Sequence, residues 1–195
     1  MKKIICSLCI ICFITLFPSY KASASDMAYS VKANLPENQR NKEHTYFDLL
    51  MKPKQKQTIS ITFENHLEKP IELEVNYNTA QTNDNGVIDY KGTKERKDSS
   101  LEYELKELIT GDQIIKLNSK EKKEVPYTIT MPDKTFEGIL LGGFHIHKKE
   151  KEDSTNQKVQ IKNDYSYVIG VQLTETENKV TPELKLNSVK PGLNN

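Results

Sequence analysis

Four histidines are the side chains of this sequence best suited to metal binding: His44, His66, His145 and His147. His145 and His147 lie two positions apart in a predicted strand, so their side chains share one face of that strand. Two imidazoles on one face can begin a zinc site. Because no third ligand follows at a recognisable spacing, we predict a solvent-facing strand end and no metal site.

A second cluster of polar side chains could supply oxygen ligands to calcium: Asn83, Asp84, Asn85 and Asp89. Its spacing differs from the calcium loop of helix–loop–helix sites, in which the ligands alternate and end with a glutamate. Asparagine tolerates left-handed backbone angles and glycine favours them, so the run from Asn83 to Gly86 is also typical of a turn. We favour the turn over a bound ion.

Catalytic motifs are not evident in the sequence. A serine nucleophile needs a histidine base and a recognisable elbow, and neither stands out. A glycosidase needs two carboxylates at a set separation, but 27 acidic residues allow almost any pair to be proposed. We therefore predict that the protein is not an enzyme, with no catalytic residues and no cofactor.

The N-terminal segment predicts export. Lys2 and Lys3 precede an uncharged apolar run from Ile4 to Phe17, and Ala22-Ser23-Ala24 offers small residues to a signal peptidase. The run is shorter than the roughly 20 residues that a membrane-spanning helix needs. We predict a signal peptide over residues 1–24 and a mature, secreted chain that starts at Ser25.

The three cysteines, Cys6, Cys9 and Cys12, all lie inside this signal. Each follows a large apolar residue, whereas a lipidation cysteine follows a small one, so we do not expect a lipoprotein. Without them the mature chain cannot hold a disulfide, a thiolate metal site or a cysteine nucleophile.

The near-neutral balance of 28 Lys and Arg against 27 Asp and Glu argues against a nucleic-acid partner. No second long apolar segment follows residue 24, so we expect no membrane span in the mature chain.

Period-two alternation of apolar and polar residues dominates the mature chain and is typical of half-buried strands. It is clearest over residues 58–64, 71–77 and 125–131, and further strands are predicted at 27–33, 46–51, 113–117, 136–146, 164–173 and 184–189. The short polar turn from Asn65 to Pro70 predicts a hairpin. Polar stretches at 82–100 and 148–162 predict loops. The pattern favours an all-β, immunoglobulin-like antiparallel β-sandwich, in which Phe63, Val75, Ile129 and Ile169 should be buried.

One segment departs from the alternation. Leu101, Leu105 and Leu108 have helical spacing, Ser99 and Glu102 could form a capping box, and Gly111 lies where a helix would end. Leu101, Tyr103 and Leu105 could instead alternate along a strand. We predict a strand that runs into one short helical turn.

Glycines interrupt the predicted strand at 136–146, at positions 138, 142 and 143. Glycine within a strand marks a bulge, a bend or a close backbone approach. We favour a strand that bends to cross between sheets. The alternative is an edge, at Gly142 and Gly143, where a partner strand pairs with bare backbone.

An ordered series of motifs resembles a known family. The series runs through Leu35-Pro36-Glu37-Asn38-Gln39, Tyr46-Phe47-Asp48-Leu49, residues 82–90 from Thr82 to Tyr90, Met131-Pro132, Phe136-Glu137-Gly138, Leu141-Gly142-Gly143, residues 165–170 from Tyr165 to Gly170, and Pro182-Glu183-Leu184. Together these motifs are similar to the N-terminal domain of the WxL-interacting surface proteins of Gram-positive bacteria, over about residues 28–189.

The resemblance implies a peptidoglycan-binding β-sandwich over residues 25–190 that works beside WxL-domain proteins at the cell wall. It also implies, in full members, a second sandwich that binds host or partner proteins, then a membrane span. Because only the tail 191–195 remains, we expect that second domain and anchor to be absent from this sequence, which is either a fragment or a short member held only by the wall.

Glycan strands and stem peptides offer acetamides, hydroxyls and carboxylates, which amide, carboxylate and aromatic side chains can bind. We therefore predict ligand-binding side chains in two segments: Asn83, Asp84, Asn85, Asp89 and Tyr90, and Glu37, Asn38 and Gln39. For a WxL partner that pairs with a strand edge, we predict contact at Gly142 and Gly143.

Overall fold

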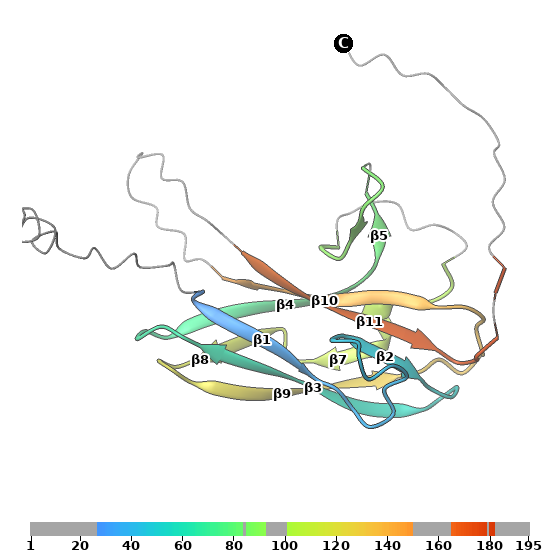
Figure 1. Ribbon diagram of the computed structural model, residues 1–195, viewed down its shortest axis with the longest axis horizontal. Helices are drawn as coiled ribbons and strands as arrows, with labels where there is room; N and C mark the ends of the chain where they lie inside the picture. The colour runs from blue at the N-terminus through green and yellow to red at the C-terminus, as the bar shows by residue number, and fades with distance from the viewer. Residues whose placement is uncertain (1–26, 84, 93–100, 150–164, 179, 182–195) are drawn as a thin grey trace, which may run out of the picture.

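Two stacked β-sheets form the protein, as the alternation predicted (Figure 1). The computed structural model describes residues 27–83, 85–92, 101–149, 165–178 and 180–181. The four-stranded sheet has the order β1 (Tyr29–Asn34), β3 (Lys56–Asn65), β9 (Lys122–Thr130) and β7 (Ile109–Gly111). The five-stranded sheet has the order β2 (Phe47–Leu50), β11 (Ser166–Thr174), β10 (Leu140–Lys148), β4 (Ile71–Thr79) and β8 (Ile114–Leu117). The prediction of an all-β sandwich is confirmed.

A small hairpin stands out from the five-stranded sheet (Figure 1). It pairs β5 (Gln81–Thr82) with β6 (Ile88–Asp89) and lies where the sequence predicted only a loop. The pairing is two residues long on each strand, too short to produce an alternating pattern.

The connection from Asn65 to Pro70 is not a hairpin, so that prediction is wrong. β3 pairs with β1 and β9, whereas β4 pairs with β10 and β8 in the other sheet. A short polar turn does not distinguish a hairpin from a crossing, and the crossing lets the apolar faces of both strands meet in one core. The buried Asn65 holds the crossing, because its Nδ2 donates to the carbonyl oxygens of Lys69 at 2.8 Å and Asn118 at 2.6 Å.

One strand pair departs from the predicted antiparallel arrangement. β2 runs parallel to β11, from Phe47 beside Val171 to Leu50 beside Thr174. The other paired strands of the described residues are antiparallel.

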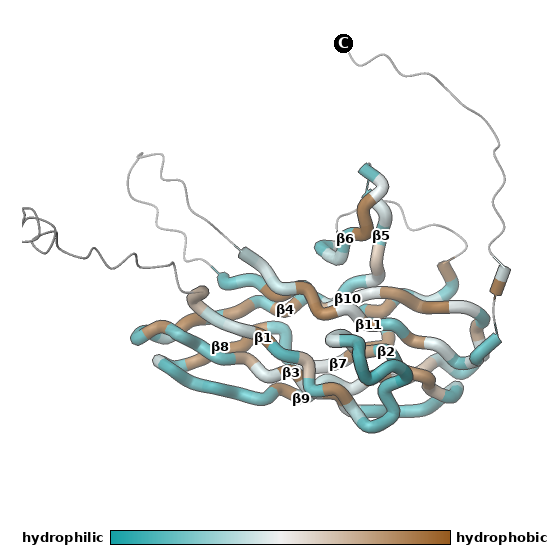
Figure 2. The backbone as a smooth tube through the Cα atoms, in the orientation of Figure 1, coloured by the Kyte–Doolittle hydropathy of each residue, from teal (hydrophilic) through white to brown (hydrophobic). Residues whose placement is uncertain are grey.

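The core lies between the two sheets and contains the residues predicted to be buried. Phe63, Val75 and Ile129 are fully buried, and Ile169 is 8% exposed. Phe144 lies at the centre of an aromatic cluster, with its ring centroid 4.8 Å from that of Tyr127. Figure 2 shows hydrophobic and hydrophilic residues in turn along the strands, as this packing requires.

The segment that departs from the alternation contains a single helical turn, α2 (Leu105–Leu108), which continues directly into β7. The predicted turn is confirmed, but residues 101–104 form no strand, and the strand follows the turn instead of preceding it. Its capping residues are Glu104 and Glu107, not the predicted pair, because the turn begins later than expected. Gly111 lies within β7 and does not end the helix.

Several predictions concern residues outside the described part of the chain. They are the signal peptide at 1–24, the strand at 184–189, the tail at 191–195, and the side chains of Ser99 and Asp84. Within the residues that the structure describes, no helix is long and apolar enough to cross a membrane.

Candidate functional site

A hollow of about 420 Å³ opens on the outer face of the five-stranded sheet. Four segments of the chain meet there: β10, β11, the residues just before β2, and the residue that follows β6. The residues that line it are Thr45, Tyr46, Tyr90, Leu141, Val168, Ile169, Gly170 and Gln172. None of these side chains is charged, so the hollow is a neutral site with aromatic, aliphatic and amide walls.

Two glycines on neighbouring strands leave the sheet without side chains beside the hollow. Gly143 of β10 is the register partner of Gly170 of β11. A Cβ atom at Gly143 would lie 2.9 Å from Cδ1 of Tyr90, and one at Gly170 would lie 3.5 Å from Cβ of Tyr46. The absence of side chains at these two positions therefore lets both tyrosines approach the sheet closely.

The Tyr90 side of the hollow is held through its backbone. The side-chain amide of Asn78, on β4, donates a hydrogen bond to the Tyr90 carbonyl oxygen at 2.9 Å. Asp89 accepts a hydrogen bond from the backbone N–H of Lys91 at 2.8 Å. Gly92 then adopts a positive φ of 72° directly against Asn78, which a larger residue could not do.

The predicted polar loop around Asn83 is a turn stabilised by its own side chains. The Asn83 side-chain oxygen accepts hydrogen bonds from the backbone N–H groups of Asn85, at 3.0 Å, and Val87, at 3.1 Å. Gly86 has a positive φ of 74°, as the turn interpretation expected. Tyr90 is thus the only predicted ligand residue of this described segment that lines the hollow, and Asn85 is exposed at the hairpin tip.

In the second predicted segment, Gln39 is buried and structural, whereas Glu37 and Asn38 lie at the surface. Gln39 is buried, and its amide donates to the Tyr46 carbonyl oxygen at 2.6 Å while its side-chain oxygen accepts from the Asp48 N–H at 3.2 Å. Asn38 forms a reciprocal amide pair with Gln57 of β3, at 2.8 and 2.7 Å. Glu37 is exposed. Gln39 therefore positions a wall of the hollow, and neither Glu37 nor Asn38 lines it.

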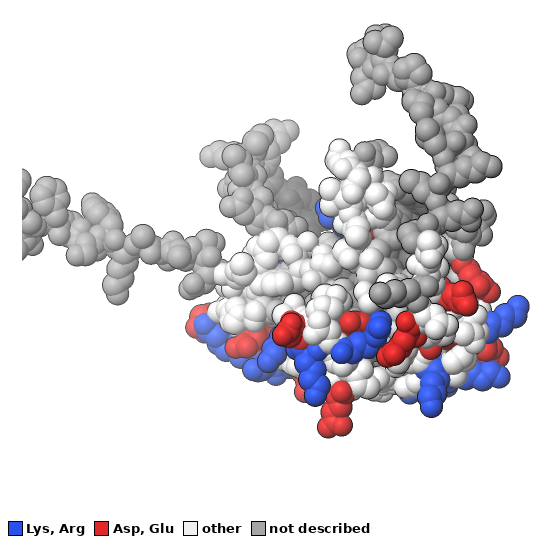
Figure 3. All heavy atoms as spheres, turned by 45° about the vertical axis from the view of Figure 1, so that its right-hand side comes forward, with Lys and Arg blue, Asp and Glu red and all other residues white. Residues whose placement is uncertain are grey.

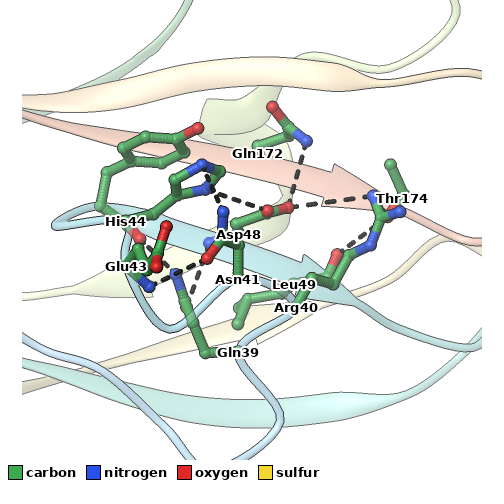
Figure 4. A network of polar contacts seen from close by, with 10 residues as sticks. Gln39, Arg40, Asn41, Glu43, His44, Asp48, Leu49, Gln172 and Thr174 are labelled. Carbon is green, nitrogen blue, oxygen red and sulfur yellow. Dashed lines mark hydrogen bonds and ion pairs between the residues drawn. The ribbon is translucent and has the colours of Figure 1, made fainter.

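A buried carboxylate fixes the other wall (Figure 4). Asp48, which is 4% exposed, accepts a hydrogen bond from the Gln172 amide at 3.1 Å and lies 3.2 Å from Nδ1 of His44. The guanidinium of Arg40 lies 3.9 Å from the same carboxylate. Two residues that line the hollow are held by this network, since Gln172 contacts Asp48 directly and Tyr46 stacks on His44 with ring centroids 4.5 Å apart.

The histidine–aspartate pair is placed to support structure. Nε2 of His44 contacts the side-chain amide of Asn41 at 3.1 Å, and Nδ1 lies 3.2 Å from the Asp48 carboxylate. Both ring nitrogens therefore face partners that belong to the same segment. This network was not predicted from the sequence, in which its signal is the i, i+4 spacing of His44 and Asp48.

His145 and His147 share the outer face of β10, as their spacing predicted. Their ring centroids are 5.4 Å apart, and Nε2 of His147 lies 3.7 Å from the Glu74 carboxylate. Among the described residues, no group of three or more His, Cys, Asp and Glu could hold a metal ion.

The predicted partner edge at Gly142 and Gly143 is wrong, because β10 is an interior strand. Gly142 pairs with Val171 on one side and Thr79 on the other, and Gly143 pairs with Gly170 and Asn78. A glycine pair marks a close approach of other groups to a strand, but it does not show which strand lies at an edge.

Charged side chains gather away from the part of the surface that carries the β5–β6 hairpin. In Figure 3 the lysines, arginines and acids lie mainly in the lower part of the view, where the four-stranded sheet lies, and the part around the hairpin is mostly uncharged.

Comparison with protein families gives two matches. Residues 29–148 match the family described as WxL Interacting Protein, peptidoglycan binding domain. Residues 156–195 match the family described as WxL Interacting Protein, host binding domain. The second match differs from our expectation that the second domain is absent, and it includes β11, which pairs with β10 and β2 in the first sandwich.

Solved structures with a similar fold are distant in sequence. The PapD-like domain of human CEP192 is 10% identical, with 84% of this chain and 99% of that chain covered and a TM-score of 0.44. A chaperone–tip adhesin complex of CFA/I fimbriae biogenesis is 6% identical, with 80% and 61% covered and a TM-score of 0.47. A family 123 glycoside hydrolase from Clostridium perfringens is 10% identical, with 79% and 28% covered and a TM-score of 0.45. No conclusion about function rests on these similarities. No curated protein sequence matches the chain.

Proposed function

This chain belongs to the family of WxL-interacting proteins, and from this membership we propose that it is a secreted module that binds peptidoglycan at the Gram-positive cell wall without cleaving it. The observation that carries the proposal is the match of residues 29–148 to the family's peptidoglycan binding domain. The signal-like N-terminus supports export to the compartment in which this polymer lies.

The hollow supports binding without catalysis. Of the described residues that line it, none carries a carboxyl, imidazole or thiol group that could act as an acid, a base or a nucleophile. The nearby Asp48 and His44 contact each other, Asn41 of the same segment, and Gln172 of β11. Such a site can recognise a neutral group through its aromatic, aliphatic and amide walls.

Sedimentation with purified wall sacculi tests the proposal. The mature chain, residues 25–195, should pellet with sacculi at moderate salt and stay in solution without them. Incubation should release no reducing ends or soluble wall fragments. A chain that remains in the supernatant would refute binding, and released fragments would refute the non-catalytic role.

A second candidate function is assembly with a protein partner, such as a WxL-domain protein, through a strand edge. β1 is the edge strand of the four-stranded sheet and pairs only with β3 among the described strands. The backbone of Tyr29 faces away from β3, because its N–H donates to the Tyr165 hydroxyl and its carbonyl accepts from Tyr167. By alternation, Val31 and Ala33 also direct their backbone groups to this edge.

Co-purification with WxL-domain proteins tests this candidate. Val31→Pro removes an outward N–H without removing a bond to β3, and it should abolish co-purification while sacculus binding persists. Equal recovery of the partner with Val31→Pro would exclude the β1 edge.

A further inference from the structure

We propose that the hollow between Tyr46 and Tyr90 holds an N-acetylated pyranose ring of the glycan strand, and not the stem peptide. The proposal rests on the proposed function and names the part of peptidoglycan that the domain recognises. It follows from the chemistry of the lining, the shape of the floor and the way in which the walls are held.

The aromatic walls suit a sugar ring. A pyranose ring has a flat face of C–H groups, and an aromatic side chain offers a rigid apolar surface against which such a face can pack. Tyr46 and Tyr90 come from segments far apart in the sequence, yet both line this one hollow. The volume of about 420 Å³ falls within the range of about 300–1,000 Å³ that is usual for small-ligand pockets.

The floor of the hollow has glycine on two neighbouring strands. Gly170 lines the hollow and pairs directly with Gly143, so both strands present backbone where side chains would stand. Tyr90 lies close over Gly143 and Tyr46 close to Gly170, so a sugar ring would pack beside these two rings, and a larger side chain at either glycine would crowd them.

The polar groups that reach the hollow match an acetamide better than a carboxylate. Gln172 and Thr45 supply neutral amide and hydroxyl groups, which can both donate to and accept from an N-acetyl group. Carboxylates of a stem peptide are best bound by arginine or lysine, and neither residue is in the lining. Arg40, which lies close by, is directed to Asp48 and to the hydroxyl of Thr174 at 3.3 Å.

The walls are held before any ligand arrives. Gln39 binds the Tyr46 carbonyl, Asn78 binds the Tyr90 carbonyl, and Asp48 accepts from Gln172. Each of these hydrogen bonds fixes a group that lines the hollow. A site prepared in this way loses little conformational entropy on binding, which favours a small neutral ligand.

Titration with an N-acetylglucosamine tetramer, followed by backbone amide NMR, tests the proposal on the mature chain. The tetramer should shift the resonances of the lining residues, and a free stem pentapeptide should not. Gly170→Ala is the most informative variant, because its new methyl group would meet Tyr46 at 3.5 Å, an ordinary contact, and should leave the fold intact. We expect Gly170→Ala and Tyr46→Ala each to bind the tetramer about 10-fold more weakly.

A control variant separates the hollow from the rest of the surface. Tyr103→Ala removes a half-buried tyrosine that packs against Phe136 outside the hollow, and it should leave binding of the tetramer unchanged.

The outcomes distinguish this proposal from the proposed function. If the wild type pellets with sacculi but the tetramer does not bind, or Gly170→Ala binds it normally, the sugar assignment is overturned and peptidoglycan binding stands. Resonance shifts of the lining by the pentapeptide alone would also overturn it. If the tetramer binds at the hollow but sacculi do not retain the chain, the sugar site is supported and the proposed function fails.

Discussion

Removal of β11 should unfold the domain, although the match to the peptidoglycan binding family ends before this strand. β11 lies between β10 and β2 in the five-stranded sheet, and among the described strands it is the one that pairs with β2. A chain that ends at Lys149 would therefore expose one whole edge of β10 and leave β2 with only the isolated bridge from Leu49 to Gln39.

The magnitude follows from the buried side chains of β11. Ile169, Val171 and Leu173 are 8%, 0% and 0% exposed. At roughly 1.5–3 kcal/mol for each buried side chain, their loss removes about 5–9 kcal/mol of stabilisation. A domain of this size is stable by only about 5–15 kcal/mol, so the truncated chain should be largely unfolded.

Circular dichroism and urea unfolding at 25 °C can measure this effect. A chain of residues 25–181, which retains β11, should unfold cooperatively, whereas residues 25–149 should show no cooperative transition. A cooperative transition of the shorter chain, with a free energy of unfolding within about 1 kcal/mol of the longer one, would refute the reasoning.

Four further predictions concern single residues. Phe63→Ala should lower the free energy of unfolding by about 3–5 kcal/mol in urea titrations, because the side chain is fully buried; a loss near zero would contradict its place in the core. Asp48→Ala should lower the free energy of unfolding by about 1–3 kcal/mol, since it leaves the Gln172 amide without its acceptor and removes the carboxylate beside His44, and NMR should show movement of the hollow. Gly142→Ala should cost about 1–3 kcal/mol, because its methyl group would overlap Leu105 and the Asn78 carbonyl, whereas Gly170→Ala should be neutral or stabilising. Burial raises the pKa of Tyr127 above its ordinary 10.0, so the tyrosine should contribute its full share to the free energy of unfolding below pH 10. Above pH 10 this contribution should fall, because the tyrosine ionises in the unfolded chain first. The melting temperature of Tyr127→Phe should therefore fall less than that of the wild type over the same range.

The strands could be predicted from the sequence because each has one face in the core and one outside. The alternation that buries Phe63, Val75 and Ile129 is local, and no knowledge of partners is needed to read it. Partner choice is not local. The same polar turn after Asn65 would serve a hairpin or a crossing, and only the packing of the two sheets selects the crossing.

The candidate site could be predicted only in part for the same reason. Tyr90 was predicted because it ends a polar segment, and Gln39 because of its amide, although its role is to hold Tyr46. Tyr46 and Gln172 were not predicted, since the hollow arises where four segments meet across the sheet. The spacing of residues within any one segment does not indicate that these four segments pack together.

Gly142 and Gly143 of β10 lie on opposite faces of the sheet, and each allows a close contact on its own face. Inside, a side chain at Gly142 would overlap Leu105 of α2, whose backbone N–H donates to the Thr79 hydroxyl at 2.8 Å. Outside, a side chain at Gly143 would meet the Tyr90 ring. The glycine pair is therefore required by two close approaches to an interior strand, not by a partner at an edge. It follows that a substitution at Gly142 disturbs the inner packing and one at Gly143 disturbs both the β11 backbone and the Tyr90 wall, whereas Gly170, which has room for a methyl group, allows the hollow to be changed alone.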